Sequence, residues 1–100
     1  MEDKITKEKL KKYFKITSKA LEEVKKNIIP KKESSAKEII EMAENYLSDA
    51  KHFEKQGHFV NSFAALNYAH GWLDAGARLG LFDVDGDNVL FTVDNNPNEQ

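Results

Sequence analysis

The chain has 100 residues, a formal net charge of −2 and no cysteine. This length supports one domain with a single core, and the lack of cysteine excludes disulfides and thiolate metal sites and favours a reducing compartment. The first residues hold no apolar run typical of a signal peptide, and the most apolar segment, 63–82, contains Asp74 and Arg78. We therefore expect a soluble, cytoplasmic protein without a membrane segment.

Charge is divided unevenly along the chain. Residues 1–32 hold eleven lysines against five acids, whereas residues 33–100 hold three lysines and one arginine against twelve acids. Such a division is typical of a basic arm that binds nucleic acid. It is also typical of two oppositely charged surfaces that pair within one molecule or between two copies.

A first helix is predicted over residues 7–29. Ile5, Thr6 and Leu10 fit a hydrophobic staple around a threonine N-cap. Pro30 is expected to end the helix, because the residue before a proline avoids the helical region. The apolar seam of this helix follows heptad spacing and consists of Leu10, Phe14, Thr17, Leu21, Val24 and Ile28.

Two further helices are predicted over residues 36–55 and 59–80. Ser35 and Glu38 fit a capping box at the start of the second helix, and Gly57 is expected to end it. The third helix carries two stripes, one made of Phe59, Phe63, Leu66 and Leu73, the other of Ser62, Ala65, Ala69, Trp72, Gly76 and Gly80.

Two glycines lie inside the third predicted helix. Gly71 and Gly76 should each cost about 1 kcal/mol relative to alanine. We therefore predict close backbone contact between each of them and a neighbouring element. The Gly-x-x-x-Gly spacing of Gly76 and Gly80 favours the same tight packing.

The C-terminal region changes character. Residues 81–93 contain two β-rich runs around a turn-forming cluster, which predicts a short hairpin, and residues 94–100 are expected to be disordered. The sequence as a whole predicts an all-α fold: a three-helix up-down-up bundle with a short C-terminal β-hairpin or extended tail. Residues 1–93 should form a single helical-bundle domain.

The same region resembles a calcium-binding loop. Asp83, Asp85, Asp87 and Asp94 occupy positions 1, 3, 5 and 12 of an EF-hand loop. Asn88 replaces the expected glycine, an aspartate replaces the bidentate glutamate, and no exit helix is predicted after Asp94. A hairpin turn with solvated carboxylates is therefore favoured, and we expect no cofactor or metal.

Four polar residues share one face of the third predicted helix: Asn67, His70, Asp74 and Arg78. His70 and Asp74 are four residues apart, so the carboxylate could orient the imidazole for acid–base chemistry or for ligand binding. Pairs at this spacing also simply support helices. Asp49 and His52 of the second helix could meet His70 and Asp74 at a metal, but no zinc-binding spacing is present. We assign no catalytic or metal-binding residues, and treat the four as a candidate binding site.

Residues 42–82 resemble a known family. The segments "AENYLSDAKHF", "FAALNYAHGWLDAG" and "RLGLF" occur in the order and spacing of the archaeal family catalogued as domain of unknown function 357. This resemblance implies an all-helical bundle in an archaeal cytoplasm. It implies no activity and no catalytic residues.

The sequence favours a non-enzymatic protein-interaction or scaffold module over an enzyme. The expected partner is a second copy, giving a homodimer, or another protein that binds a helix face. The alternative is RNA or DNA binding through the lysine-rich first helix, by Lys7, Lys11, Lys12, Lys15 and Lys19.

Overall fold

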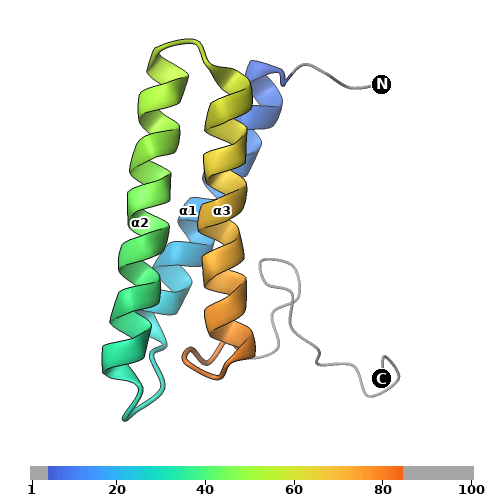
Figure 1. The fold of residues 1–100 in the computed structure, drawn as a ribbon. Helices are drawn as coiled ribbons and strands as arrows, with labels where there is room; N and C mark the ends of the chain where they lie inside the picture. The colour runs from blue at the N-terminus through green and yellow to red at the C-terminus, as the bar shows by residue number, and fades with distance from the viewer. Residues whose placement is uncertain (1–4, 85–100) are drawn as a thin grey trace.

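The computed structural model describes residues 5–84, which form three helices (Figure 1). These are α1 (Lys7–Lys26), α2 (Glu33–Lys55) and α3 (Phe59–Arg78), and they run up, down and up. The predicted all-α bundle is confirmed. The predicted hairpin from residue 85 onward, the predicted tail and three of the four carboxylates of the calcium-like loop lie outside the described residues. Within residues 5–84, no helix has the length and apolarity that crossing a membrane requires.

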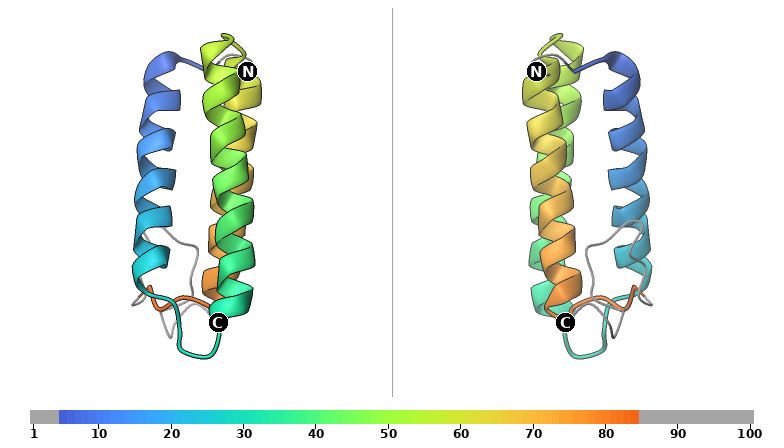
Figure 2. Two further views of the ribbon diagram at one scale, coloured as in Figure 1. Left: turned by 90° about the vertical axis from the view of Figure 1, so that its left-hand side faces the viewer. Right: turned by 90° about the vertical axis from the view of Figure 1, so that its right-hand side faces the viewer.

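The helices pack unequally. α2 and α3 lie side by side along their length, whereas α1 packs mainly on α3 and stands further from α2 (Figure 2). Buried alanines on α2 and α3 permit this close pairing, because they add little bulk between the backbones. Ser62 on α3 is fully buried and donates a hydrogen bond from Oγ to the carbonyl oxygen of Ala50 at 2.7 Å. The side chains that fill the core between all three helices include Leu10, Val24, Leu66 and Leu73.

The start of α1 agrees with its prediction. The Thr6 side chain accepts a hydrogen bond from the backbone N–H of Lys9 at 3.1 Å, which is the expected N-cap. Among the seam residues, Leu10, Thr17, Leu21 and Val24 are buried, and Phe14 and Ile28 pack partly buried against the core.

α1 ends at Lys26, three residues before the predicted end. Asn27 caps the helix and donates from its side chain to the Glu23 carbonyl at 2.7 Å. Beyond it the chain pairs with the segment that follows α3: Ile28 and Phe82 form an antiparallel bridge. The neighbouring backbone bonds, Ile29 N to Leu81 O and Asp83 N to Asn27 O, measure 2.9 and 2.7 Å. These bonds hold the chain outside the helix, and Pro30 cannot bond to the carbonyl of Lys26 four residues earlier.

The predicted capping box at Ser35 is wrong. α2 begins at Glu33, and its N-cap Lys32 makes no side-chain capping bond. A turn precedes it, closed by Lys32 N bonding Ile29 O at 3.0 Å, with Lys31 at a φ of 74°. The first helical bond then joins Ala36 N to Lys32 O, and Ala36 is fully buried. The packing of Ala36 in the core therefore favours an earlier start of α2 than the predicted N-cap at Ser35 would give.

Glycines end the second and third helices. Gly57 and Gly80 have φ values of 79° and 78°, a region that L-residues avoid. In both cases the following N–H bonds back into the last turn, His58 N to Phe53 O and Leu81 N to Gly76 O, which is the Schellman arrangement. The predicted end of α2 is confirmed, and α3 ends two residues before Gly80.

The two glycines inside α3 differ. A Cβ at Gly76 would collide with the Phe82 ring and lie 3.1 Å from Cγ2 of Ile39, so a neighbouring element does approach closely there. The contacts are with these side chains and not with the neighbouring backbone that was predicted. A Cβ at Gly71 would meet nothing within 4 Å. The prediction for Gly71 is wrong, because this residue faces outward and has no neighbour within the described chain.

Candidate functional site

The predicted polar stripe lies on the side of α3 that faces α1. His70 Nδ1 is 3.4 Å from Oγ1 of Thr17 on α1, and its Nε2 is 3.9 Å from Oδ1 of Asp74. Asn67 and Arg78 are exposed on the same helix. The structure therefore brings His70 and Asp74 close together and adds Thr17 to them. Sequence spacing could not predict the contact between Thr17 and His70, because these residues are 53 positions apart.

A hydroxyl, an imidazole and a carboxylate in a row resemble a nucleophilic triad, but burial argues against that use. Thr17 is only 2% exposed, so a substrate cannot approach its hydroxyl. Both contacts are also longer than the 2.6–3.2 Å expected between a nucleophile and its base. The cluster instead satisfies the buried hydroxyl of the α1 seam and connects α1 to α3.

The proposed convergence of Asp49, His52, His70 and Asp74 does not occur. Asp49 and His52 are exposed on α2, while the other pair points to α1. Over residues 5–84, no group of three histidine or acidic side chains could hold a metal ion.

The three helices differ sharply in charge. α1 has eight lysines against three glutamates, a balance of +5, and α2 has three lysines against six acids, a balance of −3. α3 has one aspartate and one arginine, which cancel. All five lysines of the nucleic-acid alternative are exposed.

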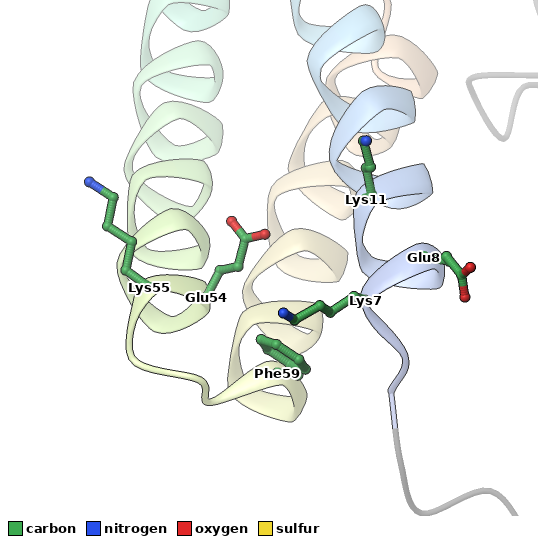
Figure 3. A pocket seen from close by; sticks show the side chains of 6 residues that line it. All are labelled: Lys7, Glu8, Lys11, Glu54, Lys55 and Phe59. Carbon is green, nitrogen blue, oxygen red and sulfur yellow. The ribbon is translucent and has the colours of Figure 1, made fainter.

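Four of these lysines line two different hollows of the surface. Lys7 and Lys11 line a hollow of about 600 Å³ between α1 and the α2–α3 turn, where Lys7 reaches over Phe59 (Figure 3). Glu8 and Glu54 line the same hollow, so its charge is mixed. Lys15 and Lys19 belong to a separate groove along the outside of α1, which also contains two glutamates.

The exposed side of α3 turned toward α2 is uncharged. Three large apolar side chains stand out there: Val60 at 58%, Tyr68 at 62% and Leu79 at 71% exposure. Small exposed residues lie between them, at spacings that keep the whole set on one helical face. We call this set the outer stripe; it consists of Val60, Ala64, Tyr68, Gly71, Ala75 and Leu79.

An apolar groove borders the outer stripe. It has a volume of about 510 Å³, lies between α2 and the C-terminal half of α3, and shares Leu79 with the stripe. Trp72, the single tryptophan of the chain, is half-buried in it. Tyr68 extends the surface by stacking on Tyr46 of α2 at a centroid distance of 5.3 Å. The groove is lined by Ile39, Met42, Trp72, Leu79 and Leu81, with Ser35, Glu38, Glu41 and Asn45 as its polar members.

We refer to the outer stripe and the groove together as the α2–α3 face. Since the opposite side of α3 is buried in the core, α3 has apolar surface on two sides, and its charged residues are confined to the polar stripe that faces α1. Contiguous exposed apolar surface marks interaction sites. The sequence does carry a signal for this face, because residues 56–73 include no Asp, Glu, Lys or Arg.

A family model described as "Protein of unknown function (DUF357)" matches residues 12–82. The chain belongs to this family. The match confirms the resemblance seen in residues 42–82, which the preceding helix also fitted, while an archaeal origin stays a prediction. It covers the whole α2–α3 face of this DUF357 domain, whereas Lys7 and Lys11 precede it. Neither a curated protein nor a solved structure matches the chain.

Proposed function

We propose that this DUF357 domain is a non-enzymatic protein-interaction module that binds its partner through the α2–α3 face. The observation that carries the proposal is the uncharged outer stripe, on a helix whose other side is already core. A solvated helix face normally carries charged residues, as the outer faces of α1 and α2 do here.

The chemistry of the face supports protein binding. Covering a Val or Leu side chain fully contributes about 1.5–3 kcal/mol, so the more than half-exposed Val60, Tyr68 and Leu79 offer several kcal/mol together. Trp72 and Tyr68 belong to the residue types that dominate binding energy at interfaces. Glu38 and Glu41 supply polar contacts beside this apolar surface.

A second candidate is nucleic-acid binding through α1. The balance of +5 on α1 and the exposure of Lys12, Lys15 and Lys19 on its outer side favour this function. These lysines lie on a different helix from the outer stripe, so the two functions can be separated by substitution.

Affinity enrichment from the native cell, with matched variants, tests the choice. Ala75→Glu places a charge in the outer stripe, at an exposed helical position where glutamate is well tolerated. Lys12→Glu reverses a charge on α1. We expect bound proteins to be lost with Ala75→Glu and retained with Lys12→Glu, while circular dichroism shows both variants folded. Bound proteins that are indifferent to Ala75→Glu but lost with Lys12→Glu would refute the assignment to the α2–α3 face.

Nucleic acid recovered with the wild type supports the second candidate only if its affinity is salt-dependent. Lysine–phosphate contacts release counterions, so the log–log slope of affinity against salt should be about −0.7 to −0.9 per contact. Binding that is absent, or unaffected by salt, eliminates this candidate.

A further inference from the structure

Gly71 has no explanation inside the described part of the chain. It lies in the middle of α3, it is exposed, and nothing occupies the 4 Å around its missing Cβ. A glycine in a helix interior costs about 1 kcal/mol relative to alanine. Gly76, by contrast, makes room for the Phe82 ring. The described fold therefore gives Gly71 no packing role, and contact with a surface outside it would supply one.

The surroundings of Gly71 form a surface of small and large residues. Ala64 lies two turns before Gly71 and Ala75 one turn after it, so small exposed residues flank Gly71 along the outer stripe. Tyr68 and Leu79 belong to the same stripe as exposed large side chains. One face thus carries both projecting side chains and spaces that could receive them, which is the pattern by which helices interlock.

We propose that the occupant of the α2–α3 face is a second copy of this chain, packed through its own α2–α3 face. This inference rests on the proposed function and names its partner. A symmetric interface brings one surface patch against itself, so the patch must tolerate its own copy. The outer stripe does so because it holds no charge, whereas α1, at +5, would repel itself.

The geometry also accommodates the acidic side chains of the groove. Glu38 and Glu41 belong to α2, at one edge of the face. A two-fold axis parallel to α3 sets α2 of each copy opposite α3 of the other. In that arrangement both glutamates face the side of the partner's α3 that carries the uncharged outer stripe, instead of each other.

The size of the face lies near the lower end of the range for stable dimers. The 20 residues of α3 span about 30 Å, and two adjacent helices of about 10 Å width give a projected area of at most roughly 600 Å², reached only where α2 contributes its full width. Stable interfaces bury roughly 600–1,000 Å² per partner.

Sedimentation equilibrium over the micromolar range tests the inference. We expect a species of twice the 11.4 kDa chain mass for the wild type. Gly71→Leu adds bulk to the outer stripe at a position where a Cβ meets no atom of the described chain within 4 Å, and Ala75→Glu adds a charge. Each should raise the dimer dissociation constant at least about ten-fold. The control Ser48→Leu places the same side chain at an exposed α2 position that borders α1, and should leave the dimer intact.

Trp72 fluorescence supplies a second readout, because this residue lies in the groove. Acrylamide quenching of the wild type should weaken as the protein concentration rises, and should stay constant for Ala75→Glu. A wild type that remains monomeric throughout, or a dimer that neither substitution weakens, overturns the inference. A monomer that binds a different protein, and whose binding Ala75→Glu abolishes, overturns the second copy as partner and leaves the proposed function standing.

Discussion

Gly71 and Gly76 provide a test of the packing of α3 in which each residue controls for the other. Both lie in α3 five residues apart, and both can be replaced by alanine. The structure gives them opposite surroundings. A Cβ added at Gly71 would meet open space, whereas a Cβ added at Gly76 would collide with the Phe82 ring and lie 3.1 Å from Ile39 Cγ2.

The expected magnitudes follow from these surroundings. Gly71→Ala should stabilise the fold by about 1 kcal/mol, because alanine is the better helix former and its Cβ meets no atom. Gly76→Ala gains the same helix propensity but must displace Phe82, and overpacking typically costs about 1–3 kcal/mol. The free energies of unfolding of the two variants should therefore differ by about 1–3 kcal/mol, with Gly76→Ala the less stable.

The assay is urea unfolding followed by helical circular dichroism, at a protein concentration where light scattering shows monomers. An unchanged m-value in both variants would assign the difference to the native state. In a domain of this size, each kcal/mol should shift the melting temperature by about 4–8 °C. Equal stabilisation by both substitutions would refute the close contact between Gly76 and Phe82, and with it the packing of the segment after α3 onto the bundle.

Other predictions concern local contacts. Ser62→Ala should cost about 1 kcal/mol, because it deletes a buried hydrogen bond between α3 and α2; unchanged urea unfolding would contradict that bond. Thr6→Ala removes the N-cap of α1 and should lower the free energy of unfolding by about 1 kcal/mol, again measured by urea unfolding. Unchanged stability together with unchanged helix content would count against the cap. Lys31→Gly should stabilise by about 0.5–1 kcal/mol, because Lys31 has a φ of 74° in a turn that favours glycine; a lower melting temperature would contradict this. The hydrogen bond to Glu44 raises the pKa of Lys25. The ion pair should therefore stabilise the fold fully at pH values below the unfolded lysine pKa of about 10.4, and this stabilisation should be lost as the pH rises through the higher pKa of the folded state. With both side chains about 40% exposed, Glu44→Gln should cost at most about 1 kcal/mol at neutral pH, and stability profiles of the two proteins should converge in strong alkali.

Local chemistry made much of the fold predictable. The Thr6 cap, the α1 seam and the helix stop at Gly57 each depend on a few neighbouring residues, so sequence spacing was sufficient. The start of α2 depended on burial of Ala36 by other helices, and tertiary packing prevailed over the Ser35 capping signal. The early end of α1 depended on backbone pairing with residues 81–83, which no local pattern encodes.

The candidate site was only partly predictable, for the same reason. The common face of His70 and Asp74 follows from helical periodicity, but their contact with Thr17 requires knowing that α1 packs on α3. The spacing of the outer stripe was readable in the sequence. Its exposure was not, because Ala64 and Ala75 look like the buried Ala65 and Ala69 until the core side of α3 is known.

A photoreactive amino acid at position 75, compared with the same group at position 12, tests the claim that the α2–α3 face is the contact surface. Both positions are exposed: position 75 lies in the outer stripe of the α2–α3 face, and position 12 lies on the outside of α1. In the native cell, we predict protein crosslinks at position 75, a second copy of the chain among them, and none at position 12. Crosslinks to protein or RNA at position 12 alone, with none at position 75, would contradict the account.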